Sequence, residues 1–529
     1  MFSTQAFSVV PFSDSGSDTR VSASLELSSD ASFDYAIYVT TRAGYATKPT
    51  DTPPNQPFRG VLQSYSFTRS INGGDIGKFA TGTGSLVISN DDAHYDFLPV
   101  DYSIDARPIQ IKLGRVSDSY GAVFPVGRVT ATGWNVDTSS IAINLTDYSY
   151  KLEVPFQPNV YGGTGGKDGS EDLTGKRCPS CFGYCQNVPA VFLVPSLLIY
   201  QVNCGPVHDI VAVRDRGIEL TKGDNYSSYA LLVSASVAAG EYATCLAEGL
   251  FKLGSVPSGT VTANVEGDAS DGYIETTAQI VRWAIRNRTD ISDPDDLDVA
   301  SFADLDVLQP APVNYWIGPD DDLKVSDFIA NLMGGIGGWG GHRRDGRFEV
   351  RVFAAPTGDQ VQSFSRSDMI GDIEKKPLPD GYNPPPHRWR VPYARSWEVQ
   401  TDLAGGVGVD VKAFVGEPYR LATAERSAIK VDHPFAQDRE PVQAYFTNDA
   451  DAQDEADRLL DLHRQYRAIY SATLPRRALR LEVGDVCRLM HERFGLSAGK
   501  LMTVIEIDER FDFGSDGNVI DSVRVTFYG

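Results

Sequence analysis

Long apolar runs are missing from this 529-residue sequence. No uninterrupted hydrophobic stretch approaches the ~18 residues that a membrane-spanning helix requires, so no transmembrane segment is expected. The opening residues, MFSTQAFSVVPFSDSGSDTR, have neither a basic start nor an apolar core and do not resemble a secretory signal. The sequence therefore predicts a protein synthesised in a cytoplasm. At the usual ~100 to 200 residues per domain, three or four domains are expected.

Basic residues are also scarce. The chain has 48 Lys and Arg against 70 Asp and Glu, which gives a formal net charge of −22. Duplex binding depends largely on Lys and Arg that neutralise phosphates, so sequence-specific nucleic-acid binding is not expected. Such an acidic surface favours solubility. The alternative is that the acidic residues line a surface along which DNA slides without adhering.

Catalytic signatures are absent as well. The seven histidines stand in no HExxH, GxSxG or Cys-His context, so metalloprotease, α/β-hydrolase and cysteine-protease chemistry is not indicated. The segment GTGGKDG lacks the spacing of a phosphate-binding loop, and no acidic run matches a calcium-binding loop. We therefore predict no enzyme. The alternative is a tail-associated or extracellular β-rich enzyme or carbohydrate-binding protein, in which folding brings two carboxylates together.

Cysteine is rare, with six in the chain, yet four of them fall within 27 residues. Cys178, Cys181 and Cys185 follow C-x2-C-x3-C, and Cys204 comes after eighteen intervening residues. Three thiols in one loop and a fourth on a returning strand match the topology of a four-thiolate metal or cluster site. His208, four residues after Cys204, could instead complete a Cys3His zinc site with Cys178, Cys181 and Cys204. Disulfides and unbridged thiols are the structural alternatives.

Short strand-like runs dominate both ends of the chain. Apolar and polar residues alternate in LQSYSFTRS, GSLVISN and SIAINLTD near the start, and in GKLMTVIEIDERF and DSVRVTFYG near the end. The predicted fold class is α+β, β-dominated and multidomain. We expect an N-terminal arm (1–34), a β domain (35–160), a second β-rich domain with the cysteines (161–272), an α+β domain (273–365) and a C-terminal β-rich domain with one long helix (366–529).

Helical spacing appears in three places. Residues 276–288 place Ile280, Trp283 and Ala284 on one face, and residues 325–338 show the same period. The segment NDADAQDEADRLLDLHRQYRAIY begins with an Asn/Asp cap and an acidic first turn, and it carries arginines towards its end. These charges suit the helix dipole at both ends, so this segment is predicted to be the long helix.

Many short phrases, in order, resemble the tail hub proteins of long non-contractile-tailed bacteriophages and related gene-transfer particles. They include TGTGSLVISNDDAHYDFLPVDYSIDARPIQIKLG, YGGTGGKDGSEDLTGKR followed by NVPAVFLVPSLLIYQVNCGPVHDIVAVRDRGIEL, LGSVPSGTVTANVEGD, YARSWEVQTDLAG, and RFGLSAGKLMTVIEID. The resemblance covers nearly the whole chain from about residue 58 and rests on no catalytic motif.

The resemblance implies a structural virion protein at the tail tip. It implies a homotrimer in which two tube-like antiparallel β domains per chain, with α/β domains between them, form a pseudo-sixfold ring on the tail tube. The implied partners are the distal tail protein, the tape measure protein and the tip or central fibre proteins, and the hub opens for genome ejection. Some hubs of these families carry an iron–sulfur cluster, which makes a 4Fe–4S cluster an option for Cys178, Cys181, Cys185 and Cys204.

Overall fold

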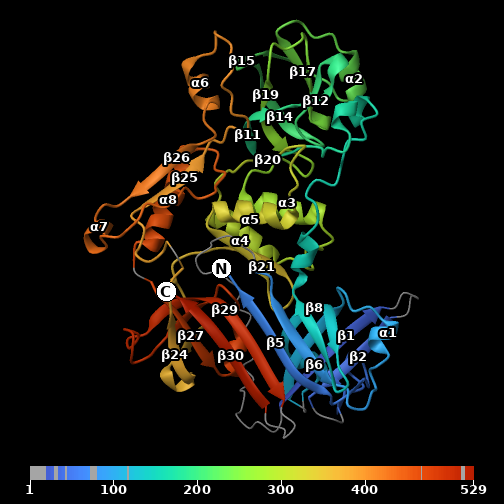
Figure 1. Cartoon of the computed structure of the whole chain (residues 1–529), viewed down its shortest axis with the longest axis vertical. Coiled ribbons are helices and arrows are strands. Elements are labelled where there is room, and N and C mark those ends of the chain that lie inside the picture. Colours follow the sequence, from blue (N-terminus) through green and yellow to red (C-terminus); the bar gives the residue numbers. More distant parts are fainter. Residues whose placement is uncertain are drawn as a thin grey trace.

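The computed structural model describes residues 19–28, 34–41, 45–71, 80–115, 118–379, 381–465, 467–513 and 519–529. Figure 1 shows three tiers: a broad β-sheet, a layer of helices above it, and a small β-rich domain at the far end. The architecture is β-dominated and built from several sheets, as expected from the sequence. Within the described residues, no helix has the length and apolar character needed to span a bilayer.

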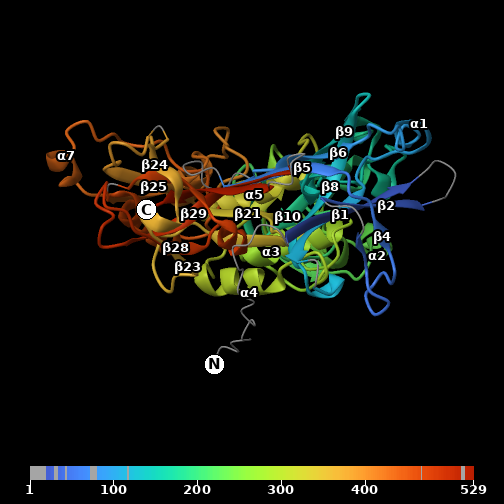
Figure 2. The same cartoon turned by 90° about the horizontal axis from the view of Figure 1, so that it is seen from below.

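The broad sheet contains strands from both ends of the chain. Its two halves meet where β5 pairs antiparallel with β29, in a register that runs from Ser70 opposite Glu506 to Ser64 opposite Asp512. Figures 1 and 2 both show these strands side by side. The main order across the sheet is β2 (Asp34–Thr40), β1 (Thr19–Ser28), β7 (Pro108–Arg115), β8 (Phe124–Val136), β9 (Ser140–Thr146), β6 (Thr83–Ser89), β5 (Leu62–Ser70), β29 (Lys500–Phe513), β30 (Val519–Tyr528), β27 (Ile469–Leu474) and β24 (Ile370–Lys376). A short branch leaves β29, where β28 (Val486–Leu489) pairs with β29 and β23 (Gln362–Phe364) pairs with β28.

Alternation of apolar and polar residues explains these strands. Along β5, the buried residues Tyr65 and Phe67 alternate with Ser64 and Ser66, which are partly exposed. A strand with one apolar face is stable only when that face packs against other apolar surface. The buried faces of both halves share a single hydrophobic core. The two β units predicted at opposite ends of the chain are therefore one continuous sheet.

Two boundaries predicted from the sequence need correction. Residues 19–28, expected in an N-terminal arm, form β1, which is paired on both sides by β2 and β7 and belongs to the first β unit. Residues 1–18 and 29–33 of that arm lie outside the described part of the chain. In the predicted C-terminal domain, β25 (Arg388–Tyr393), β26 (Arg420–Glu425) and α8 (Asp449–His463) share the core of the helical layer instead.

The structure contains the three helices predicted from the sequence, and it contains further helices in other parts of the chain. α3 (Thr277–Arg288) begins at the cap Thr276, whose hydroxyl accepts a hydrogen bond from the amide of Gln279. α5 (Val325–Gly335) packs beside it, and α8 begins at the cap Asn448. The predicted helix is longer than the observed one, because α8 ends at His463 and Ile469 already belongs to strand β27. Further helices are α1 (Leu98–Asp101), α2 (Tyr229–Ser234), α4 (Val299–Leu308), α6 (Val409–Val415) and α7 (Ile429–Asp432).

The small domain at the far end consists of two sheets that share an apolar interior. One has the order β11 (Tyr184–Pro189), β19 (Val261–Asp268), β14 (Val207–Asp215) and β15 (Ile218–Glu219). The other has the order β12 (Val191–Val194), β13 (Ile199–Gln201), β18 (Leu250–Leu253), β17 (Glu241–Cys245) and β16 (Thr221–Asn225). Two-stranded sheets complete the fold: β3 (Tyr45–Ala46) with β4 (Pro57–Phe58), β10 (Ser180–Phe182) with β20 (Tyr315–Ile317), β21 (Gly338–His342) with β22 (Phe348–Val352), and β25 with β26.

His463, at the end of α8, should make the protein sensitive to acid. It is 5% exposed and its ring stacks on Trp389. Burial, together with the charges of Arg439, Arg467 and Arg458, lowers its pKa from 6.5 to about 3. Below pH 6.5 the unfolded chain therefore binds a proton that the folded chain refuses. Stability should fall as the pH drops from 6.5 towards 3.

The variant His463→Phe keeps an aromatic ring in place and removes this titration. Between pH 6.5 and pH 4.5 the wild type should lose about 2–3 kcal/mol of stability through this one group, a loss that the variant escapes. Thermal unfolding midpoints measured across that range should diverge as the pH falls. Parallel curves for the two proteins would show that His463 does not titrate as described.

Candidate functional site

The centre of the molecule is a buried ionic junction around Glu509. Glu509 is on β29 and is fully buried. Its Oε1 accepts a hydrogen bond from Arg69 Nη1 on β5 at 3.1 Å and another from Arg344 of the helical layer. Arg344 also donates to the backbone oxygens of Val126 at 2.8 Å and Leu481 at 3.2 Å. One carboxylate and one guanidinium thus tie together both halves of the sheet and the layer above it.

Charges in this junction hold one another in place. Burial disfavours the positive charge of Arg69, but the neighbouring Glu509 outweighs that cost and raises the pKa of the guanidinium. Burial, and next the charge of Glu509, raise the pKa of Tyr65, so its hydroxyl stays protonated. A buried ion pair is costly to assemble but still costlier to break, because the remaining partner is left charged in an apolar interior.

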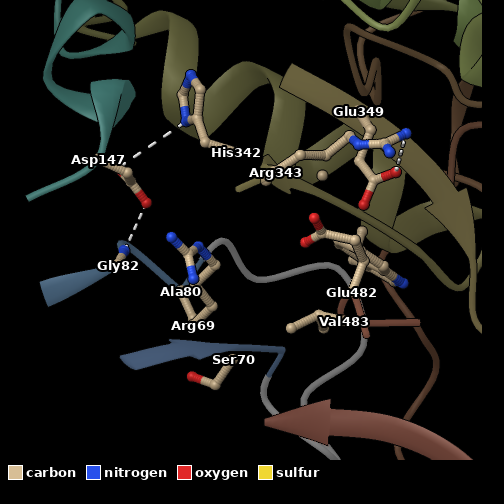
Figure 3. A pocket seen from close by; sticks show the side chains of 13 residues that line it. Arg69, Ser70, Ala80, Gly82, Asp147, His342, Arg343, Glu349, Glu482 and Val483 are labelled. Atoms are coloured by element: carbon tan, nitrogen blue, oxygen red, sulfur yellow. Dashed lines mark hydrogen bonds and ion pairs between the residues drawn. The ribbon is translucent and has the colours of Figure 1, made fainter. Parts of the chain in front are cut away.

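A small cavity lies next to the junction (Figure 3). Its volume is about 20 Å³, enough for one water molecule and too little for an organic substrate. In Figure 3 the side chains of Arg343, Glu349 and Glu482 lie on one side of it, with Asp147 and His342 on the other. The lining combines apolar surface with charged side chains, and Arg69 Nη2 and Arg343 Nε are buried without a hydrogen-bond partner. A bound water would suit this cavity better than a substrate.

Ser149, His342 and Asp147 meet beside the cavity, but they do not form a catalytic triad. Ser149 Oγ lies 3.3 Å from His342 Nδ1, and Asp147 Oδ1 lies 3.9 Å from the same nitrogen. A triad needs the serine on one ring nitrogen and the carboxylate on the other. The carboxylate of Asp147 instead accepts hydrogen bonds from the backbone amides of Gly82 at 2.5 Å and Ser149 at 2.9 Å. Burial lowers the pKa of His342. This group braces the turn after β9.

The four clustered cysteines lie in the small domain and form two contacting pairs. Cys178 is 6% exposed and packs with Cys204, which is partly exposed. Cys181 and Cys185 are both fully buried and pack together, and the thiol of Cys185 donates to the carbonyl of Phe182 at 3.3 Å. The first pair packs in one hydrophobic cluster and the second pair in another.

Backbone hydrogen bonds explain how these cysteines meet. The Cys204 amide donates to the carbonyl of Pro179 at 2.8 Å, and the Cys181 amide donates to Asn203 Oδ1 at 3.0 Å. Asn203 in turn contacts Asp268 at the end of β19, with 3.4 Å between Nδ2 and Oδ2. The loop that carries the first cysteines is therefore bound along its length to the loop after β13.

The two members of the exposed pair differ in acidity. The contact with Cys204, followed by burial, raises the pKa of Cys178. The pKa of Cys204 is lowered to about 7, first by the hydrogen bond from Cys178. The side-chain amide of Asn159, 3.5 Å from Cys204 Sγ, lowers it further. Within this pair, Cys204 is the better nucleophile.

The described residues do not assemble a metal-binding group. Nowhere in that part of the chain do three or more His, Cys, Asp or Glu side chains gather as ligands would. His208, the alternative zinc ligand, lies 3.6 Å from Glu266 and stacks on Tyr273. The geometry therefore fits two thiol pairs and does not present a preformed four-ligand site. The 4Fe–4S cluster on Cys178, Cys181, Cys185 and Cys204 stays a prediction.

The buried position of Glu509 has a signal in the sequence itself. From Ile505 to Phe511 every second residue of β29 is buried, so Glu509 falls on the inward face between Ile507 and Phe511. A carboxylate at such a position needs a buried partner. Its partners Arg69 and Arg344 are too far away in sequence for any local pattern to reveal them.

Comparison with known proteins finds a likeness only among solved structures. No protein-family model matches the sequence, and no curated protein matches it. Among solved structures, the prophage MuSo2 43 kDa tail protein from Shewanella oneidensis aligns over 95% of this chain and 98% of its own, with 10% identity and a TM-score of 0.39. The tail protein from Neisseria meningitidis MC58 aligns over 97% and 96%, with 8% identity and a TM-score of 0.39.

A third similar chain comes from the virion of a native gene transfer agent particle. It covers 67% of this chain and 84% of its own, with 15% identity and a TM-score of 0.35. Superpositions as loose as these show a likeness but carry no argument about this chain. Its function is therefore argued from its own residues and geometry.

Removing the charge of Glu509 tests the junction. In the variant Glu509→Gln, two buried arginines lose their shared counter-charge, so we expect a loss of about 3–5 kcal/mol in unfolding free energy. The matched control is Glu425→Gln, which breaks the exposed pair with Arg388 and should change stability little. Urea unfolding of both variants measures the difference. Equal, small effects would show that the junction is not what holds the sheet together.

Proposed function

We propose that this chain is a structural, non-enzymatic hub of a phage-type tail, a virion protein that assembles as a homotrimer at the distal end of the tail tube. The observation that supports this most directly is the single sheet made of two β units, because it leaves two unlike strand edges open, one on β8 and one on β24. A protein with two unlike edges associates head to tail, and such contacts close into a ring when the rotation between copies allows.

One end of the sheet is already covered. At β2, Arg59 lies along the outer side of the strand, where its amide donates to the Tyr38 carbonyl at 2.9 Å and its carbonyl accepts from Thr40 at 2.7 Å. Backbone groups used in this way cannot pair with another chain. The end of β2 from Tyr38 to Thr40 is therefore closed to another copy, and the proposed contacts lie on other strands.

The second half of β8 is an open edge. β7 pairs with β8 only as far as Thr130, and Ala131 bonds to the turn before β7. From Thr132 to Val136, the described part of the chain supplies a strand partner only on the β9 side. Val136, at the end of this edge, is 43% exposed.

The last strand of the sheet, β24, is the other open edge. It pairs with β27 on one side and ends the strand order of the described sheet on the other. Ile370 at its start is 55% exposed, although it is a large apolar residue. An unpaired strand with exposed apolar side chains is a template for another chain. β24 of one copy therefore adds to the free half of β8 in the next.

The resemblance implies three copies, and the strand order of the sheet then gives the size of the ring. From β8 to β24 the order contains eight strands, so three copies place 24 strands in the ring. Closed barrels of about 16 strands or more leave an aqueous lumen. The net charge of −22 per chain suits a lumen through which DNA moves without adhering.

The remaining surfaces then serve the tail partners. The helical layer and the small domain stand away from the sheet, as Figure 1 shows. In the proposed hub they face the distal tail protein, the tape measure protein and the tip or central fibre proteins. The hub closes the tube and opens for genome ejection. This work requires interfaces rather than catalysis.

A proline on β24 tests the ring. Asp372 lies between Ile370 and Glu374, where the pairing with β27 is irregular, and its side chain is 97% exposed. The variant Asp372→Pro should therefore leave the fold intact and block pairing with a second copy. Light scattering should find three copies for the wild type and one for the variant, at unchanged melting temperature.

Two further variants make this test specific. Asp359→Pro changes an exposed residue of the same segment outside any strand, and it should remain trimeric. The double variant Thr132→Lys and Asn135→Lys places positive charges on the open edge of β8 and should also yield single copies. A wild-type chain that stays monomeric at high concentration would contradict the proposed hub. A trimer that withstands the edge variants would contradict only the edges assigned to it.

A further inference from the structure

We propose that Cys178 and Cys204 form a disulfide when the folded chain meets an oxidising environment. The bond would fasten the segment before β10 to the loop after β13. It concerns a single copy of the chain, so it does not depend on the proposed hub function.

Contact selects this pair from the alternatives. Four cysteines allow three ways of forming two disulfides, and sequence alone cannot choose between them. In the structure the side chains of Cys178 and Cys204 pack in one hydrophobic cluster, and each thiol shifts the pKa of the other. The amide of Cys204 bonds to the carbonyl of Pro179, the residue after Cys178, at 2.8 Å. The two backbones are thus already held side by side, as a disulfide requires.

The pair of Cys178 and Cys204 differs from the other cysteine pair in its exposure to solvent. Cys204 is partly exposed, so a reagent in solution can reach its sulfur. Cys178 is nearly buried but lies directly behind it. Cys181 and Cys185 are fully buried in the neighbouring hydrophobic cluster and are shielded from reagents. The structure therefore assigns one reactive pair and one inert pair.

The surroundings suit a bond that locks a crossover. Residues 161–177 run from the helical layer into the small domain through glycines, three of which have positive φ in the stretch Gly163–Gly166. Such a segment loses much conformational entropy when it folds. A bond at the end of this segment anchors it to the small domain, and the loop that it closes from Cys178 to Cys204 restricts the unfolded chain and so favours the folded one.

The chemistry balances with a small-molecule disulfide as oxidant. The sulfur of Cys204 attacks one sulfur of oxidised glutathione, and the first glutathione leaves as a thiolate that takes up a proton. The sulfur of Cys178 then attacks Cys204 in this mixed disulfide, and the second glutathione leaves in the same way. Two protein thiols are oxidised, one glutathione disulfide is reduced to two thiols, and the two cysteine protons end on glutathione.

A disulfide here and a four-thiolate cluster exclude each other, because the bond consumes two of the four sulfurs. The experiment therefore begins with the full chain purified without oxygen, and its iron, zinc and acid-labile sulfide are measured. The same protein is then equilibrated with mixtures of oxidised and reduced glutathione. Thiols are counted under denaturing conditions, and the linked peptides are identified by mass spectrometry.

We expect metal-free protein that loses two of its six thiols, with Cys178 linked to Cys204. The variants Cys178→Ser and Cys204→Ser should each retain all five of their thiols, whereas Cys181→Ser should still lose two. The melting temperature of the wild type should rise on oxidation, and that rise should vanish in Cys204→Ser. The wild-type peptide map decides the matter even if a variant does not fold.

Three results would overturn the proposal. The first is stoichiometric iron or zinc bound through these cysteines in the anaerobic protein. The second is a folded wild type that keeps six free thiols under oxidising conditions. The third is a peptide map in which Cys181 and Cys185 are linked while Cys178 and Cys204 remain free.

Discussion

The fold depends on a carboxylate that has no access to water. Glu509 belongs to a strand near the end of the sequence, yet its partners Arg69 and Arg344 come from the first β unit and from the helical layer. Shared apolar surface would allow the two halves of the sheet to slide, because hydrophobic contact is not directional. Charged hydrogen bonds are directional, so the junction fixes the register between β5 and β29. The two open edges owe their positions to that register.

Sequence patterns identified most of the local structure and little of its assembly. The alternation in LQSYSFTRS and SIAINLTD predicted strands, and the capped helices at Thr276 and Asn448 were found at their starts. These are interactions between neighbours in the chain. The pairing of Ser70 with Glu506 crosses more than four hundred residues, and no period in either strand encodes its partner. For the same reason, β27 was mistaken for the continuation of a helix.

The cysteines show the same limit on a smaller scale. Their spacing predicted that four thiols would converge, whereas the structure divides them. Gly183 lies between Cys181 and Cys185 with φ of +61°, and a Cβ there would lie 1.9 Å from the carbonyl oxygen of Val313. This tight turn folds the second and third cysteines towards each other and away from the first. The spacing located the cysteine loop, but the turn chemistry within it decided which sulfurs meet.

The division of one sheet between distant parts of the chain also sets an order of events during synthesis. At ribosomal rates of about 5–20 residues per second, roughly 20 to 90 seconds separate the appearance of β5 from that of β29. Throughout this interval β5 has a neighbour on one side only, and Arg69 has no carboxylate to face. In the proposed hub, a nascent chain at this stage would hold an incomplete wall, and the late synthesis of β29 would keep unfinished subunits out of the ring.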